Sequence, residues 1–139
     1  MQSILIDAGP LIALFSIDDK HYSHYNDLVS TMAVDGLRLV TTWPCVVEAS
    51  YLLNNPNRYE LLEWIALGGV IVYPFASENL HDMIESMKKY TEHKKNEMDF
   101  ADATLFWLAC ETGIRDIMTI DNRDFSRYRL PDGNYFVIY

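Results

Sequence analysis

The chain has 139 residues, the size of one ordinary domain, and half of them are hydrophobic while 22% are charged. This balance excludes a disordered chain and allows a core that needs no disulfide or metal to hold it together. The formal net charge is −9, from 11 Lys and Arg against 20 Asp and Glu, which argues against a protein that holds nucleic acid mainly by bulk electrostatics. We expect a single domain over residues 1–139.

Five short runs rich in branched and aromatic residues are spaced along the chain, and such runs favour strands. They cover residues 3–6, 37–41, 70–73, 116–120 and 135–139. Segments with helical signals lie between them. These cover residues 46–53 after Pro44, 59–67 before Gly68, 79–93 with an apolar stripe, and 100–111 before Gly113.

Strands that alternate with helices predict an α/β sandwich around a mostly parallel five-stranded sheet, because parallel neighbours need a crossover connection. The last two predicted strands are separated by only a short link that contains Pro131, Asp132 and Gly133. We therefore expect the final strand to run antiparallel or to lie at an edge of the sheet.

The sequence predicts a soluble cytoplasmic protein. The first residues lack the basic start and apolar stretch of a secretory signal, and no apolar segment reaches the roughly 20 residues that cross a bilayer. Cys45 and Cys110 both lie among apolar neighbours and belong to no metal-binding pattern, so we expect two reduced core residues.

Acidic residues follow two of the predicted strands, where open α/β sheets bind their ligands. Asp7 follows the run 4–6, and Asp121 follows the run 117–120. Glu48 lies inside an apolar helical run, where burying a lone charge would be costly. Asp99 and Asp102 are three residues apart at a predicted helix start and so share a face.

Each of these acids also has a plain structural interpretation. Asp99 is a good N-cap for the helix that begins near Phe100. Asp121 suits the start of a turn, Asp7 suits the cap of a following helix, and Glu48 suits an exposed position. Together, however, the carboxylates would repel one another without a cation. Mg²⁺ or Mn²⁺ with oxygen ligands would solve that problem and activate water for attack on a phosphodiester.

Four motifs carry a resemblance to a known family. They are Ile6 to Leu14, Thr41 to Pro44 with Glu48, Met98 to Ala103, and Thr119 to Asp121 with Asp124. In this order they resemble PIN-domain proteins, and within that family the VapC-type toxins of toxin-antitoxin pairs. The match extends from Ile4 to Arg129.

The resemblance implies a three-layer PIN-like fold and a ribonuclease that uses Mg²⁺ or Mn²⁺ to cleave RNA. It implies that Asp7, Glu48, Asp102 and Asp121 are the catalytic acids and metal ligands. Asp99 would join them as a metal ligand, while Thr119 and Asp124 would have supporting roles. It also implies a homodimer and a small antitoxin partner, and no membrane.

Basic and aromatic residues suggest where partners would bind. Arg123 and Arg127 follow Asp121 directly, so we expect them to contact RNA, whereas the lysines at 88, 89, 94 and 95 suit a solvated helix end. Four residues near the N-terminal helices could supply a groove for a partner helix, with core packing as the alternative for Leu14 and Phe15. They are Leu14, Phe15, Tyr22 and Tyr25.

Three rival functions share parts of this pattern. A phosphotransfer domain also places an aspartate at a strand end, but Gly9 stands where haloacid-type phosphatases have a second aspartate, and the last strands lack the lysine of a receiver domain. The second rival is an RNA-processing nuclease without a toxin role. The third is a non-catalytic module that binds RNA or a protein without cleaving it.

Overall fold

The computed structural model describes residues 1–91 and 96–139. Five strands form one sheet in the order β3-β2-β1-β4-β5, and every neighbouring pair in it is parallel. The strands are β1 (Gln2–Ile6), β2 (Leu37–Thr41), β3 (Ile71–Val72), β4 (Asp116–Met118) and β5 (Val137–Ile138). This confirms the predicted α/β fold with a central five-stranded sheet.

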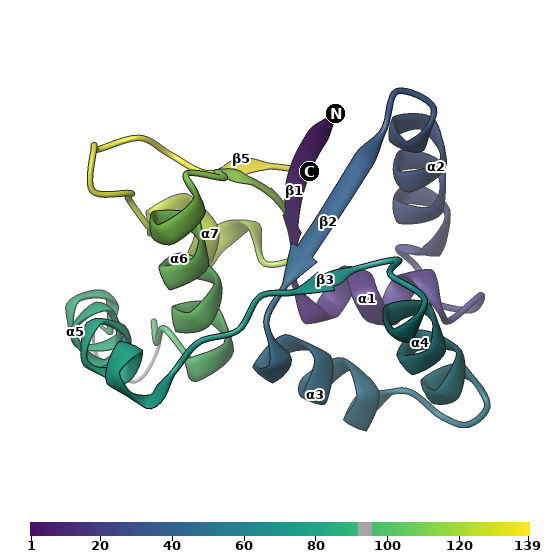
Figure 1. Cartoon of the computed structure of the whole chain (residues 1–139), viewed down its shortest axis with the longest axis horizontal. Helices are drawn as coiled ribbons and strands as arrows, with labels where there is room; N and C mark the ends of the chain where they lie inside the picture. The colour runs from purple at the N-terminus through teal and green to yellow at the C-terminus, as the bar shows by residue number, and fades with distance from the viewer. Residues whose placement is uncertain (92–95) are drawn as a thin grey trace.

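Helices cover both faces of the sheet, so the fold has three layers (Figure 1). One side holds α1 (Ala8–Leu14), α2 (Tyr22–Ala33), α3 (Trp43–Leu52) and α4 (Asn57–Ala66). The other side holds a short 3-10 turn (Ser77–Asn79), α5 (Leu80–Tyr90), α6 (Phe100–Thr112) and α7 (Asn122–Arg127). Within the described residues no helix is long and apolar enough to cross a membrane.

The central strand β1 is buried on both faces, because helices pack against each of them. Ile4 and Ile6 belong to the core cluster under α1, α2, α3 and α4, and Leu5 belongs to the cluster under α5 and α6. All three side chains have no exposed area. Alternating side chains of this one strand therefore pack into both cores, and Asp7 follows directly after its last residue.

Helix α6 owes its position to burial on nearly every side. All residues from Asp102 to Ala109 are buried, and the helix packs against α5 and α3. Asp99 caps its first turn, and Gly113 ends it in the left-handed region at φ +75°, which a residue without Cβ adopts at little cost. The buried helix thereby holds its N-terminal turn at the carboxyl edge of the sheet.

The connection between β4 and β5 corrects one prediction. Residues 122–127 form α7, a six-residue helix that the sequence patterns did not reveal, and β5 runs parallel to β4 at the edge of the sheet. The antiparallel orientation was therefore wrong, and the edge position is confirmed. An isolated antiparallel bridge between Arg129 and Tyr135 closes the turn at Pro131 before β5 begins.

Three smaller predictions also need correction. The strand expected over residues 116–120 ends at Met118, and the hydroxyl of Thr119 after it donates to Asp7. The helix expected over residues 79–93 ends at Tyr90, and His93, Lys94 and Lys95 lie outside the described residues. Cys45 is buried as expected, but Cys110 is exposed.

Candidate active site

Acidic residues gather in one cleft at the carboxyl edge of the sheet. The cleft measures about 480 Å³ and is lined by residues of α1, α3 and α6 and by the residues that precede α1, α6 and α7. Its walls include all five acids that the sequence nominated as metal ligands: Asp7, Glu48, Asp99, Asp102 and Asp121. The fold therefore brings together residues that are up to 114 positions apart in the sequence.

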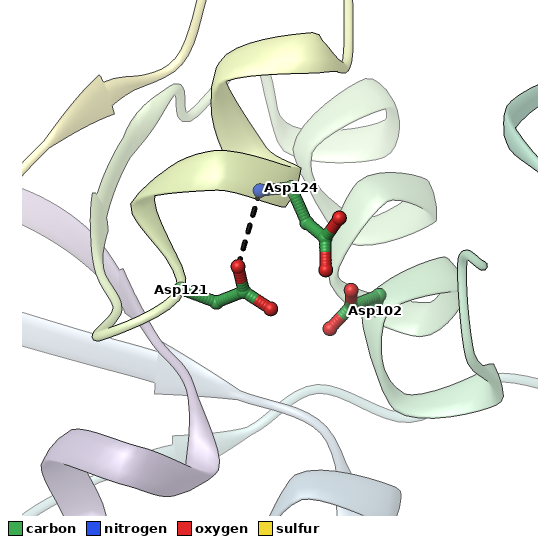
Figure 2. A group of neighbouring side chains, drawn as sticks. All are labelled: Asp102, Asp121 and Asp124. Carbon is green, nitrogen blue, oxygen red and sulfur yellow. Dashed lines mark hydrogen bonds between the residues drawn. The ribbon is translucent and has the colours of Figure 1, made fainter. Parts of the chain in front are cut away.

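Three carboxylates approach one another most closely. Oxygen atoms of Asp102, Asp121 and Asp124 all lie within 4.8 Å of one another. Figure 2 shows Asp102 on α6 and the two other aspartates at the start of α7, with their side chains pointing toward a common space. Asp124, expected only as a supporting residue, thus lies in the closest group of acids.

Asp7 is fixed by several hydrogen bonds at the end of β1. Its Oδ1 accepts from the Ala8 backbone N–H at 2.7 Å, and its Oδ2 accepts from the Thr119 hydroxyl at 2.9 Å. The Cys45 thiol lies 3.9 Å from Oδ1. These donors hold the carboxylate in one orientation at the wall of the cleft, and Thr119 has the supporting contact that its position near Asp121 suggested.

Three of the aspartates cap helices, as their sequence positions suggested, and the same three residues also line the cleft. Asp7 caps α1, Asp99 caps α6 by accepting from Asp102 N–H at 2.8 Å, and Asp121 caps α7 by accepting from Asp124 N–H at 3.1 Å. Each of the two latter bonds uses the Oδ1 atom. Because a carboxylate offers about four lone-pair sites, capping leaves oxygen atoms available for a cation.

Glu48 is less buried than its sequence neighbours suggest. It lies in an apolar run, yet its side chain is exposed, because only Cys45, Val46 and Ala49 of α3 turn into the core. The free-energy cost of completely burying its charge therefore does not arise. Glu48 lines the cleft together with the acids Asp102 and Asp121.

The electrostatics of the cleft favour neutralisation of its acids. Burial first, then the charges of Asp99 and Asp7, raises the pKa of Asp102 to about 8. Burial, followed by the hydrogen bond and charge of Asp124, raises the pKa of Asp121 to about 6. Burial, with the charge of Asp99, also raises the pKa of Asp7, and partial desolvation with the charges of Asp7 and Asp99 raises the pKa of Glu48.

These properties fit a hard divalent cation. The candidate ligands are carboxylate oxygens, which Mg²⁺ and Mn²⁺ accept and which soft metals do not select. A bound cation would also offset the burial and the mutual repulsion that raise these pKa values. Asp102, Asp121 and Asp124 are placed to hold such an ion, with Asp7, Glu48 and Asp99 around the same cleft.

Sequence reasoning missed one neighbour of the acids. The Tyr128 hydroxyl donates to Asp102 Oδ2 at 2.8 Å, and both residues are buried. The two residues are 26 positions apart and belong to no common motif. A bulky aromatic residue shortly after the last acid was the one available signal, and it does not distinguish a site residue from a core residue.

The two arginines expected to contact RNA differ in the contacts that they already make within the chain. Arg123 is exposed. Arg127 pairs with Asp124 at 3.2 Å and donates to the Tyr90 carbonyl oxygen at 3.2 Å. Arg127 is therefore already engaged within the chain, and its contact with RNA, like that of Arg123, stays a prediction.

The residues expected to receive a partner helix differ in their exposure to solvent. Tyr25 is buried and donates its hydroxyl to the Tyr139 carbonyl oxygen at 3.2 Å, so core packing is the correct interpretation for it. Leu14, Phe15 and Tyr22 are partly exposed around a groove of about 370 Å³.

The parallel sheet between two layers of helices, with acids at its carboxyl edge, defines the class as α/β. One solved structure with a similar fold is VapC20 of Mycobacterium tuberculosis, a sarcin-ricin loop cleaving toxin. It matches with a TM-score of 0.65 and 19% sequence identity, over 82% of this chain and 86% of that one. The predicted resemblance to VapC-type PIN proteins is thus confirmed for the fold. No protein-family model and no curated protein sequence matches the chain.

The raised pKa of Asp102 predicts how stability depends on pH without divalent ions. The unfolded chain releases this proton near pH 4 and the folded chain holds it up to about pH 8, so the folded state binds more protons between these values. The free energy of unfolding should therefore fall as pH rises from 5 to 8. The Asp102 contribution is roughly a few kcal/mol.

Urea unfolding of the parent and of Asp102→Asn in EDTA, at pH 5, 6, 7 and 8, measures this contribution. The parent should lose stability relative to the variant as pH rises, because asparagine has no proton to release. A difference between the two chains that stays constant across the four pH values would contradict the electrostatic account.

Proposed function

We propose that the chain is an endoribonuclease that requires Mg²⁺ or Mn²⁺ and hydrolyses phosphodiester bonds of RNA. The observation that carries this proposal is the approach of the Asp102, Asp121 and Asp124 carboxylates to within 4.8 Å. Asp102 and Asp121 also line one cleft with Asp7 and Glu48. The likeness of fold to a toxin that cleaves the sarcin-ricin loop supports RNA as the substrate.

We assign roles to the acids accordingly. Asp7, Glu48, Asp102 and Asp121 are the catalytic residues, and Asp99 is a further metal ligand. When bound, the divalent ion supplies an activated water and stabilises charge on the phosphodiester. Thr119 and the Ala8 N–H orient Asp7, and Asp124 adds carboxylate oxygen beside Asp121. Glu48, like Asp99 and Asp121, is exposed to solvent.

The net charge of −9 repels an RNA substrate, so local positive charge is needed for RNA to bind. The bound ion offsets part of the local charge, and the exposed Arg123 directly follows the site. Phosphate contacts through so few cations would be weakened by salt. We therefore propose Arg123 and Arg127 as RNA-binding residues, with Arg127 able to bind only by giving up its pair with Asp124.

The first test is cleavage of RNA by the metal-loaded chain. Asp7→Asn and Asp102→Asn should each lower the rate by about 100-fold or more, since even outer partners of metal ligands contribute 10- to 100-fold. EDTA should abolish cleavage of the parent, and Mg²⁺ or Mn²⁺ should restore it. Asp35→Asn, an exposed acid outside the cleft, is the control and should cut at the parent rate.

Two results would reject this assignment. One is cleavage by both cleft variants at the parent rate with Mg²⁺ or Mn²⁺ present. The other is cleavage by the parent that persists unchanged in EDTA. Binding of RNA by the parent without any cleavage would favour the non-catalytic module instead.

We further propose that the ribonuclease is the toxin of a toxin-antitoxin pair. A free ribonuclease harms its own cell, and an acidic cleft offers an inhibitor a natural target. An arginine from a small antitoxin protein could pair with Asp7 or Asp102 in place of the metal ion. We propose that the partner's helix binds in the groove lined by Leu14, Phe15 and Tyr22.

Inducible expression in a bacterial host tests the toxin role. Growth should stop with the parent chain, continue with Asp7→Asn, and recover when the protein encoded by the adjacent gene is co-expressed. Harmless expression of a chain that cleaves RNA in extracts of the same cells would reject the toxin role and favour an RNA-processing nuclease.

We also propose a homodimer that forms through the outer face of α3. Trp43, Val47 and Tyr51 recur at every fourth residue and are 53%, 63% and 80% exposed, flanked by Leu62 at 41% and Phe100 at 42%. Taking roughly 150–250 Å² for a complete aromatic side chain, these exposed parts supply on the order of 500 Å² of apolar surface. A stable interface needs about 800 Å² per partner, of which roughly 60% is apolar.

Val47→Asp tests the dimer, because it places a charge at the centre of this face. We expect the parent to sediment as a dimer in analytical ultracentrifugation and Val47→Asp to sediment as a monomer. Val34→Asp is the matched control, since Val34 is 83% exposed at the end of α2, and it should stay dimeric. A monomeric parent, or a dimeric Val47→Asp, would contradict the proposal and assign the face to another partner.

A further inference from the structure

A buried tyrosine joins the acid cleft to the aromatic core behind it. Tyr128 directly follows α7, has no exposed area, and donates its hydroxyl to Asp102 Oδ2 at 2.8 Å. Among the side-chain hydrogen bonds of the described residues, this is the one that joins α6 to the segment 121–130. It therefore connects the two elements that supply the closest group of acids.

Ring packing holds the Tyr128 hydroxyl in place. The ring makes edge contacts with Tyr90 of α5 and Phe125 of α7, both at a centroid distance of 5.1 Å, and with Phe106 of α6 at 6.2 Å. A ring that touches neighbours on three helices has little freedom to swing. The position of its oxygen atom is thus set by the core and not by the acids.

Asp102 depends on this hydroxyl for its orientation. Its side chain accepts no other hydrogen bond among the described residues, while its backbone N–H donates to Asp99. The tyrosine occupies one lone pair of Oδ2 and leaves Oδ1 and the remaining lone pair free. The same segment carries Asp121 and Asp124 at the start of α7 and Tyr128 just after its end. One hydrogen bond can therefore fix the spacing between Asp102 and both other carboxylates.

We propose that Tyr128 is a positioning residue of the metal site, which raises the affinity for a divalent cation by holding the Asp102 carboxylate in register with Asp121 and Asp124. The inference rests on the proposed function only in taking Asp102 as a metal ligand. Partners that orient metal ligands typically contribute 10- to 100-fold to metal affinity. Tyr128 itself does not touch the cation.

The competing interpretation is a core tyrosine whose hydroxyl has found a convenient acceptor. Tyr90 provides a matched control within the same aromatic cluster. Its hydroxyl donates to the Arg129 carbonyl oxygen at 3.3 Å and accepts from the Arg129 N–H at 3.0 Å, with no hydrogen bond to an acid of the cleft. Loss of a structural hydroxyl changes stability alone, whereas loss of a positioning hydroxyl also changes metal affinity.

Calorimetric titration of the metal-free chains with Mn²⁺ separates the two interpretations. Tyr128→Phe should raise the Kd for Mn²⁺ about 10-fold, and Tyr90→Phe should leave it within about two-fold of the parent even if it lowers stability. In the Asp102→Asn background, Tyr128→Phe should produce no further rise. Circular dichroism and urea unfolding of the same samples report whether each variant is folded. A second set of titrations contains sucrose, which stabilises the folded state of any variant of low stability.

Each failure has its own signature. If Asp102→Asn weakens Mn²⁺ binding but Tyr128→Phe binds as tightly as the parent, the positioning role is overturned and the proposed metal site stands. An equal loss of affinity in Tyr90→Phe and Tyr128→Phe would also overturn it, since both would then act through stability. If the parent itself binds no Mn²⁺, the proposed metal site is overturned together with this inference.

Discussion

Repulsion between carboxylates is the constraint on which the candidate site depends. Two unit charges 4 Å apart repel by on the order of 4 kcal/mol near a protein surface, and this chain brings oxygen atoms of three aspartates within 4.8 Å of one another. Burial adds to that cost, as the raised pKa of Asp102 shows. Such an arrangement persists only because the rest of the fold holds it, and a divalent cation would remove most of the penalty.

The fold holds most of these acids at or close to the start of a helix. Asp7 ends a strand buried on both faces, Asp99 and Asp121 cap helices, and Asp102 lies in the first turn of a helix that is buried almost all round. Caps orient carboxylates without consuming all of their oxygen atoms. Stability and site geometry are therefore served by the same hydrogen bonds, so the capping interpretation and the metal interpretation of each acid do not compete.

Much of this arrangement could be predicted from the sequence, because local patterns carry it. Apolar runs ending in Asp7 and near Asp121 locate strand ends, and the Asp99 spacing locates the start of α6. The rest depends on packing between distant segments. Helix α7 is too short to show a period, Glu48 is exposed because α3 buries a different face, and the bond from Tyr128 to Asp102 spans 26 positions. No local pattern encodes contacts of that kind.

A crystal of the chain soaked in Mn²⁺ and measured with anomalous scattering tests the central claim most directly, since it locates the cation without relying on activity. We expect an anomalous peak in the cleft, within about 2.0–2.5 Å of carboxylate oxygens that include Asp102 and Asp121. A peak elsewhere on the molecule, or an empty cleft at saturating Mn²⁺, would contradict the proposed metal site.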